Sequence, residues 1–260
     1  MKIATFNVNS LKVRMENLKV WLKEADPDVV CLQETKSTDE TFPRAELEDL
    51  GYNLAIHGQK TYNGVALISK HPLEDIRIGL PGDDGDEQAR YIEAVIPAGD
   101  TVLRVASIYL PNGNPVDTEK FPYKLRWMER LKAHAAELLT YEEPLVLAGD
   151  YNVIPTADDV YDEKAWEGDA LTQPQSRAAL REIINLGFTD AFRACHAEPH
   201  RYTFWDYQAG RWQKGQGIRI DHLLLSPQAA DRLTGCDIDI APRGREKPSD
   251  HTPIWAKLAF

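Results

Sequence analysis

Short apolar, β-branched runs alternate with segments of helical periodicity along the chain. Apolar runs bounded by turn residues predict strands, which we place at 2–8, 28–33, 64–69, 102–110, 144–149, 219–225 and 253–259. Apolar residues at helical spacing predict helices, which we place at 11–25, 123–140, 177–186 and 228–234. No internal repeat or low-complexity linker interrupts this alternation. The pattern predicts one α/β domain over 1–260.

The helix predicted at 123–140 has one apolar face. Its inward positions are expected to be Leu125, Met128, Lys132, Ala135 and Leu139. Lys132 fits this face because a lysine stem can lie along apolar surface while the ammonium reaches water.

Composition narrows the class of protein. Of 260 residues, 43% are hydrophobic and 27% charged, which is typical of a globular domain. The three cysteines lie far apart, which argues against a disulfide framework or a CxxC zinc site and suits a reducing compartment. No run is apolar enough to span a membrane, and the first residues lack the apolar core of a signal peptide. We therefore expect a cytoplasmic protein without membrane contact.

The net charge of −11 at first disfavours a nucleic-acid partner, because phosphates attract Lys and Arg. The acidity is concentrated, however, in 37–50, 83–87 and 141–169, which together carry −16. The rest of the chain carries +5. Each acidic run is most simply a solvated face.

Polar side chains repeatedly interrupt or follow the predicted strands. They are Asn7, Asn9, Glu34, Asp150, Asn152, Asp221, Asp250 and His251. In α/β proteins, functional groups gather at strand ends and in the loops beyond them. Taken singly, Asn7, Asn9 and Asn152 are most simply turn formers. Glu34 is a poor turn residue after a buried strand, and a divalent cation is one partner for its carboxylate.

Asp221 lies inside an apolar strand, where an ionised carboxylate is costly unless it is paired. Strand alternation points the next residue, His222, to the opposite face, so His222 is expected to be a core histidine. His251 is the better partner for Asp221, and the adjacent Asp250 is a candidate metal ligand.

This set of side chains suits phosphodiester hydrolysis. Oxygen ligands without a Cys or His cluster favour Mg²⁺ or Mn²⁺ over zinc, and the natural partner of magnesium is a phosphate. Asp150 can activate a water, and Asn152 can donate to the charged transition state. Asp221 can fix the tautomer of a histidine that faces the phosphate. Tyr109 can donate to the same group.

Six motifs carry a family resemblance: FNVNS (6–10), LQETK (32–36), YLPNG (109–113), GDYN (149–152), RIDHLL (219–224) and SDHTPIW (249–255). Their order resembles the exonuclease III type of abasic-site endonuclease, within the endonuclease/exonuclease/phosphatase superfamily. The likeness covers nearly the whole chain. It implies a four-layer α/β sandwich, with two packed mixed sheets flanked by helices. It also implies a magnesium-dependent DNA-repair hydrolase that cleaves 5′ to abasic sites and removes 3′ nucleotides or blocking groups.

The resemblance also implies roles for residues at matching positions. Glu34 resembles the main metal ligand, with Asn7, Asn9 and Asp250 beside it, and Asp150 and Asn152 belong to both the metal site and the chemistry. Tyr109, Asp221 and His251 resemble the remaining catalytic groups, and Asn112 a phosphate contact. Two positions depart from the family pattern: Ser10 stands where Gly is common, and His222 where Leu or an aromatic residue is common.

The segment 202–219 interleaves aromatic and basic residues, which suits nucleic acid. We expect Trp205 and Trp212 to form a pocket for the abasic sugar, although the aromatic residues of this segment are alternatively plain core. The expected contacts to DNA are Arg90, Arg211 and Lys214. In the helix predicted from 123, Lys124, Arg126 and Arg130 are either further DNA contacts or solvent-exposed.

The expected partner is duplex DNA with abasic sites or recessed 3′ ends, bound by a monomer. Two alternatives remain open from the sequence. One keeps the fold but changes the substrate to a phosphoinositide, a sphingomyelin-type lipid or undamaged DNA. The other is a catalytically inactive DNA-binding module, which would not need a buried Asp beside a histidine.

Overall fold

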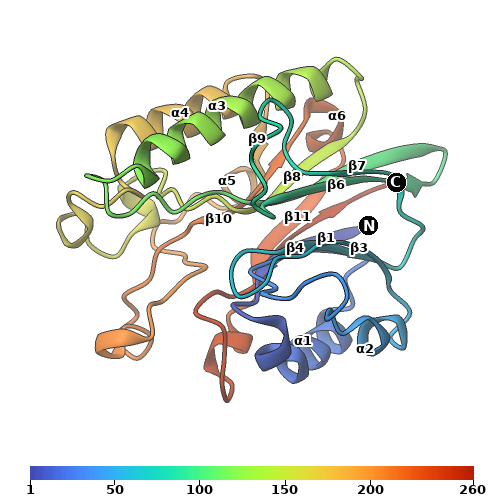
Figure 1. Ribbon diagram of the computed structural model, residues 1–260, viewed down its shortest axis with the longest axis horizontal. Coiled ribbons are helices and arrows are strands. Elements are labelled where there is room, and N and C mark those ends of the chain that lie inside the picture. Colours follow the sequence, from blue (N-terminus) through green and yellow to red (C-terminus); the bar gives the residue numbers. More distant parts are fainter.

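Two six-stranded sheets pack face to face and carry helices on their outer sides (Figure 1). This computed structural model describes residues 1–260. The first sheet, in spatial order, contains β11 (Leu233–Ile238), β12 (Ile254–Leu258), β1 (Lys2–Asn7), β2 (Val29–Gln33), β4 (Val65–Ser69) and β3 (Asn53–His57). The second contains β5 (Glu74–Ile78), β6 (Tyr91–Ala98), β7 (Thr101–Tyr109), β8 (Leu145–Asp150), β10 (Asp221–Leu225) and β9 (Thr189–Asp190). Both sheets are mixed, because β1–β2 and β7–β8 are parallel and the other pairs are antiparallel.

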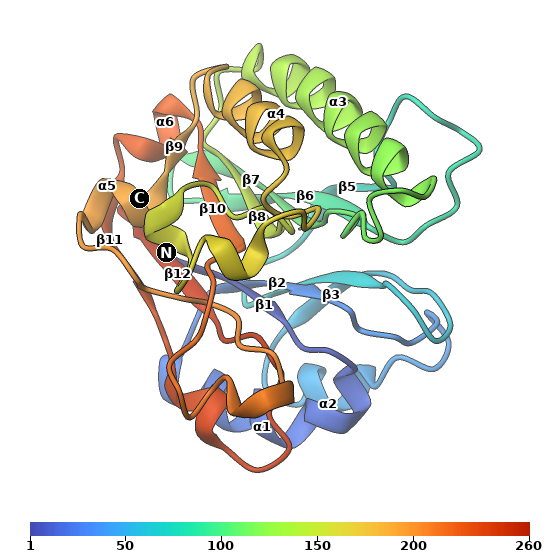
Figure 2. The same cartoon turned by 90° about the vertical axis from the view of Figure 1, so that its left-hand side faces the viewer.

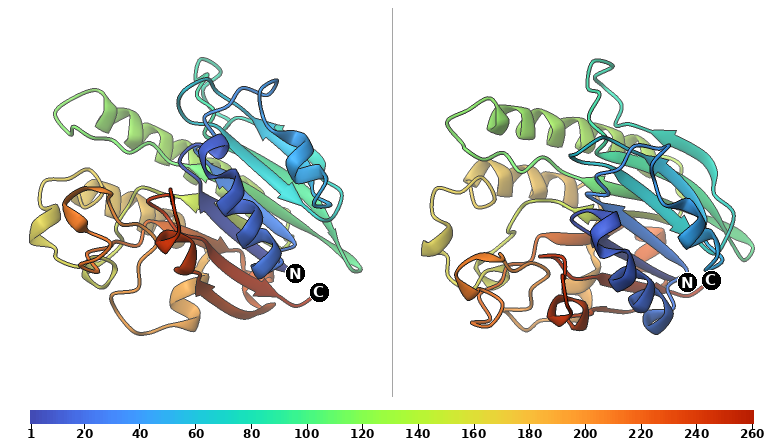
Figure 3. Two further views of the ribbon diagram at one scale, coloured as in Figure 1. Left: turned by 90° about the horizontal axis from the view of Figure 1, so that it is seen from below. Right: turned by 60° about the horizontal axis from the view of Figure 1, so that its bottom comes forward.

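The helices complete a four-layer α/β sandwich, as the family resemblance implied. They are α1 (Leu11–Ala25), α2 (Arg44–Glu48), α3 (Lys120–Leu139), α4 (Pro174–Ile184), α5 (Ala191–Cys195) and α6 (Pro227–Ala230). Short 3₁₀ turns lie at η1 (Ala157–Asp159), η2 (Lys164–Trp166), η3 (Gln208–Gly210) and η4 (Ala241–Gly244). Helices α1 and α2 cover the first sheet, and α3 and α4 cover the second (Figures 1 and 3).

Three apolar layers hold the sandwich together. The largest lies between the sheets and combines residues such as Ile3 and Cys31 of the first sheet with Val105 and Val146 of the second. Each such buried side chain contributes roughly 1.5–3 kcal/mol of transfer free energy. The other two layers lie beneath α1 and beneath α3 with α4. The layers fix the distance between the sheets and therefore between the polar groups at their ends.

The buried face of α3 is shifted by one position from the predicted one: Met128 and Ala135 are buried as expected, whereas Leu125, Lys132 and Leu139 are not among its buried residues. Its buried positions are Phe121, Lys124, Trp127, Met128, Leu131, His134, Ala135 and Leu138. Lys132, which was predicted to lie on this face, is bound instead to Glu129 and Glu182 at the surface. Lys124 is completely buried, so both expectations for it, a DNA contact or solvent exposure, are wrong. Burial of the apolar side chains from Phe121 to Leu131 stabilises the protein by more than the burial of one lysine costs.

The predicted helix at 228–234 is also wrong in part. Only Pro227–Ala230 form a helical turn, which Ser226 caps by accepting a hydrogen bond from the Ala229 amide. The chain then enters β11 at Leu233. Strand pairing with β12 therefore overrides the local helical pattern.

The polar groups expected at strand ends lie at one edge of the sandwich. Parallel β1 and β2 end there in one sheet, and parallel β7 and β8 end there in the other. Strand β10 runs antiparallel to β8 and begins at this edge, with Asp221 opposite Asp150. Figure 2 looks onto this edge and onto the loops that surround it.

Candidate active site

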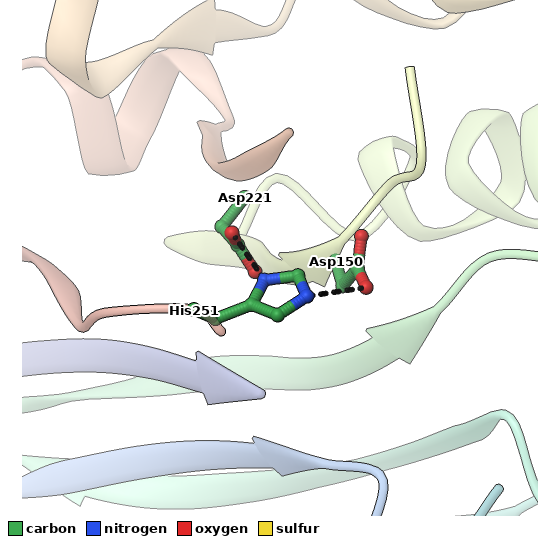
Figure 4. A group of neighbouring side chains, drawn as sticks. All are labelled: Asp150, Asp221 and His251. Carbon is green, nitrogen blue, oxygen red and sulfur yellow. Dashed lines mark hydrogen bonds and ion pairs between the residues drawn. The ribbon is translucent and has the colours of Figure 1, made fainter. Parts of the chain in front are cut away.

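A histidine lies between two buried aspartates at the edge where the sheets meet (Figure 4). His251 Nδ1 is 2.8 Å from Asp221 Oδ2, the pairing favoured by strand alternation, and Nε2 is 3.7 Å from Asp150 Oδ2. The opposite face of β10 holds His222, which is 1% exposed, as expected of a core histidine. Phe204 packs edge-on against the His251 ring at 5.0 Å and limits its movement.

Burial and charge set the protonation of this group. Burial raises the pKa of Asp150 to about 7, although the nearby His251 opposes the shift. For His251, burial acts to lower the pKa, but the carboxylates of Asp221 and Asp150 outweigh it and raise the pKa to about 10. His251 is therefore an imidazolium at neutral pH, with an N–H on each nitrogen. With a pKa near neutrality, Asp150 can both take up and release a proton at neutral pH.

Glu34 follows β2 and collects three hydrogen-bond donors. Its Oε1 accepts from Asn7 Nδ2 at 3.0 Å and from the Tyr109 hydroxyl at 2.9 Å, and its Oε2 pairs with Lys36 Nζ at 2.9 Å. Burial acts to raise the pKa of Glu34, but the hydrogen bonds from Asn7 and Lys36 lower it below the usual value. Burial also raises the pKa of Tyr109 well above its usual value, so its hydroxyl remains a donor.

The Asn7 side chain joins the two halves of the site. Besides Glu34, its Nδ2 donates to Asp150 Oδ2 at 3.0 Å, so one amide nitrogen contacts carboxylates from both sheets. Its Oδ1 accepts from the backbone amide of Asn9, which fixes the orientation of the amide. Asn9 continues the contacts outward, since its Nδ2 donates to Asp250 Oδ1 at 3.1 Å and its Oδ1 accepts from Lys36 Nζ at 2.6 Å.

The donor set around Glu34 fits a hard divalent cation. Glu34, Asp150 and Asp250 supply carboxylates and the asparagines supply amide oxygens, which are the ligands of Mg²⁺ and Mn²⁺. The Lys36 ammonium is held between Glu34 and Asn9 oxygens, which shows that the position favours positive charge. Asp150, Asp221 and His251 also bring ligand atoms within 4.8 Å of one another. In that trio the His251 imidazolium already lies between the two aspartates and supplies the positive charge, so the Glu34 side is the better cation position.

Asn152 follows Asp150 in a left-handed conformation, with φ 47. Its Nδ2 donates to the Leu110 carbonyl at 2.9 Å, and because a carbonyl only accepts, the amide orientation is fixed. Its Oδ1 accepts from Asn112 Nδ2 at 3.0 Å. The second N–H of Asn152 is left for a ligand, so this orientation favours hydrogen-bond donation to a substrate over metal ligation.

The candidate DNA contacts lie around the same edge and differ in how far their side chains are buried. Arg90 stacks over the Tyr109 ring at 4.8 Å, and Lys214 is exposed in the loop after η3. Arg211 Nη1 is held by Tyr161 and Gln216. Trp205 is only 5% exposed and packs edge-on against Trp212 at 4.9 Å, so Trp205 is interior, while the partly buried Trp212 lines a surface cavity with Tyr207 and Arg243.

The contacts that four residues of this region make were not expected from the sequence. Lys36 binds the Glu34 carboxylate, and its place two residues after the acid was the available signal. Lys124 lies at buried helical spacing between Phe121 and Met128, which could have identified it. Asn114 and Asp169 are bonded to each other at 3.0 Å across a long sequence separation, which no local pattern reveals.

The profile of the Endonuclease/Exonuclease/phosphatase family matches residues 4–251. Exodeoxyribonuclease III of Haemophilus influenzae is 35% identical, over 99% of this chain and 100% of that protein. An AP endonuclease structure from Archaeoglobus fulgidus superposes with a TM-score of 0.94 at 39% identity, with 100% of both chains covered. A 3′ phosphatase from Neisseria, bound to a product DNA hairpin, superposes with a TM-score of 0.95 at 36% identity, again over 100% of both chains. Helices long and apolar enough to cross a membrane are absent.

Proposed function

The chain belongs to the endonuclease/exonuclease/phosphatase family, as a DNA-repair nuclease of the exonuclease III type, and from this premise we propose its substrate and mechanism. The proposed reaction is magnesium-dependent hydrolysis of the phosphodiester 5′ to an abasic site in duplex DNA. The same site is proposed to remove 3′ nucleotides or 3′ blocking groups. The observation that carries the proposal is the buried Asp221–His251–Asp150 arrangement beside the Glu34 oxygen cluster.

Asp150 is the proposed base. Its Oδ1 accepts from the Asn152 backbone amide and its Oδ2 from Asn7, so the carboxylate is held rigidly while it takes a proton from the attacking water. A rigid carboxylate is effective because orientation contributes several kcal/mol to a reaction barrier.

His251 and Asn152 are the proposed donors to the phosphoryl oxygens. Asp221 holds His251 Nδ1, so the Nε2–H has one direction in which to donate. The N–H of Asn152 that has no protein partner would donate as charge develops on the phosphate, and the Tyr109 hydroxyl would join it by turning from Glu34 to the phosphate. Glu34, with Asn7, Asn9 and Asp250, would hold Mg²⁺, or Mn²⁺ in its place, and the ion would neutralise charge on the phosphate and leaving oxygen.

The test is incision of a duplex with one abasic analogue, measured with magnesium or with chelator. We expect magnesium-dependent cleavage 5′ to the lesion, and Asp150→Asn is expected to lose on the order of a thousandfold or more in rate. Asp158→Asn, an exposed acid in the same acidic segment, is the matched control and should cleave normally. Duplexes with a recessed 3′ end or a 3′ phosphate, run in parallel, report the second activity.

Four results would contradict the proposal. Cleavage in chelator, or equal cleavage by Asp150→Asn, would remove the proposed roles of the metal and of the base. Turnover of a phosphoinositide or sphingomyelin in place of DNA would change the substrate class. Tight DNA binding without turnover of any substrate would indicate a binding module.

A further inference from the structure

Lys124 is a fully buried cation that the proposed mechanism does not use. It lies on the inward face of α3, at 0% exposure, with Phe121 and Met128 on the same face of the helix. Its Nζ donates to two backbone carbonyls, that of Asn112 at 3.0 Å and that of Asn152 at 2.6 Å. These carbonyls belong to the loop after β7 and the loop after β8, which both border the site.

Stability does not account for a lysine at this position. An ammonium loses its hydration when it is buried, and burial lowers the pKa of Lys124 to about 7, although the charges of Asp150 and Asp169 oppose the shift. Its Nζ is bonded to two carbonyls and to no carboxylate. An apolar side chain would suit the surrounding face of α3 better, because its neighbours are apolar. A buried lysine that costs folding free energy and lies at the border of a site points to a functional role.

The two loops are shaped to receive the lysine. Gly113 has φ +91, and a Cβ placed on it would lie 2.7 Å from Lys124 Cδ, so the loop after β7 can pass over the lysine stem only as glycine. Asn152 has φ 47, a left-handed conformation that an asparagine tolerates but does not prefer. The Lys124 ammonium binds the carbonyl of this strained residue directly.

The side-chain amides of Asn152, Asn112 and Asn114 are linked by hydrogen bonds that fix which end of each amide donates. Asn112 Oδ1 accepts from the Asn114 backbone amide at 3.2 Å, which obliges Asn112 to present its Nδ2 to Asn152. Asn114 Nδ2 in turn donates to Asp169 Oδ1 at 3.0 Å. Hydrogen bonds from neighbouring groups therefore orient the side-chain amides of Asn112 and Asn152, and Lys124 holds the backbone carbonyls of the same two residues.

We propose that Lys124 is a positioning residue, whose ammonium clamps the carbonyls of Asn112 and Asn152 and so aims these two amides at the scissile phosphate. The inference rests on the proposed function for its catalytic consequence. It concerns orientation and does not require Lys124 to touch substrate.

The test substitutes Lys124→Met, which keeps the stem length and removes the ammonium. The substitution relieves the cost of burying the ammonium but leaves the carbonyls of Asn112 and Asn152 without this donor, so the midpoint of thermal unfolding should change little or fall, and kcat is compared at equal distance below each midpoint. The kcat for abasic-site incision should fall roughly 10- to 100-fold, with KM unchanged within about twofold, because orientation acts on the chemical step. Leu131→Ala, on the same helix face, is the control: it should lower the unfolding midpoint and leave kcat unchanged well below that temperature.

Wild-type kcat in Lys124→Met would overturn the proposal. So would a loss of kcat that matches the loss in Leu131→Ala at equal distance below each unfolding midpoint, since that is a purely structural effect. A measurement without substrate separates this inference from the proposed function: the side-chain ¹⁵N amide signals of Asn112 and Asn152 should shift in Lys124→Met and stay in place in Leu131→Ala. Unshifted signals would overturn the clamp whatever the enzyme cleaves, and shifted signals support it even if DNA is not the substrate.

Discussion

At the scale of single residues, Ser10 links the metal-site loop to α1 in a conformation that suits glycine. Its φ is 83 and its ψ 101, and its side chain makes no capping hydrogen bond to the helix. Its backbone amide is nevertheless fixed to the Glu34 carbonyl at 2.8 Å. The site therefore demands this backbone path, and serine adopts it at a cost.

Ser10→Gly is expected to raise the free energy of unfolding by about 0.5–1 kcal/mol. Glycine removes a positive-φ penalty of roughly 1–2 kcal/mol and gives back part of it through a more flexible unfolded chain. Urea denaturation of the two proteins at neutral pH measures the difference. A variant that is less stable than wild type would show that the serine side chain, and not the backbone, determines the loop.

Among single residues, the sequence revealed two carboxylates whose charge conflicts with an apolar strand, although it missed the equally buried Lys124. Glu34 and Asp221 could be predicted because a carboxylate at or within an apolar strand needs a partner. Asn114 and Asp169 could not, because their contact joins loops 55 residues apart in sequence. The buried state of Trp205 was likewise open in a segment that mixes rings and cations, and its packing on Trp212 is a tertiary property.

At the scale of elements, β10 and η1 are joined by a buried charged cluster behind Asp150 and Asp221. Arg219 donates to Asp159 at 2.7 Å and to Asp190 at 2.9 Å, and its Nη1 lies 3.0 Å from His222 Nδ1. Burial and the adjacent Arg219 lower the pKa of His222 to about 4, although the two aspartates oppose the shift. His222 is therefore held neutral beside a cation.

This cluster predicts a stability that falls in mild acid. Unfolded His222 takes up a proton near pH 6.5 and the folded form only near pH 4, so the unfolded state binds more protons between these values. The contribution of neutral His222 to the free energy of unfolding is full above about pH 6.5 and is lost progressively as the pH falls toward 4. His222→Gln keeps an acceptor for Arg219 and removes the titration. Between pH 7 and 5, wild type should lose about 2 kcal/mol more than the variant in urea denaturation.

Equal pH slopes for the two proteins would contradict this assignment. The comparison isolates His222, because the other titrating groups, including Asp150 and His251, are common to both proteins.

Elements were predictable where one pattern dominates. The central strands are continuous apolar runs, and all seven expected strands have a counterpart. Five strands were missing from the prediction: β3, β6 and β9, and also β5, whose residues are all exposed, and β11, whose pattern is broken by polar residues and a glycine. The last two are held by pairing with β6 and β12, which a single local window does not contain.

At the scale of the whole molecule, the acidic runs are not simply solvated faces. Asp159 binds Arg219, Glu163 binds Arg177, and Asp86 binds Arg130. Part of the positive charge outside these runs is therefore engaged within the protein. Cations outside such ion pairs, exposed Lys214 among them, are left for DNA phosphates, while the net charge of −11 repels the polyanion at long range.

DNA cleavage should nevertheless depend steeply on salt through KM, because salt competes with the cations that do meet phosphates. Each phosphate contact contributes a slope of about 0.9 in log KM against log salt, so two or more contacts raise KM about tenfold or more between 50 and 200 mM salt. Steady-state kinetics on an abasic duplex at several salt concentrations measure the slope, and kcat should change little.

Lys214 connects that slope to a particular surface. It is exposed in the loop after η3, so Lys214→Ala should lower the slope by about one unit if its ammonium meets a phosphate. Lys257→Ala is the matched control, because Lys257 is exposed on β12 and pairs in register with Lys2, at the end of β1 opposite Asn7. A flat wild-type response, or equal effects of the two substitutions, would mean that phosphate contacts at this edge do not set the affinity. Shape recognition of the distorted duplex would then have to supply it.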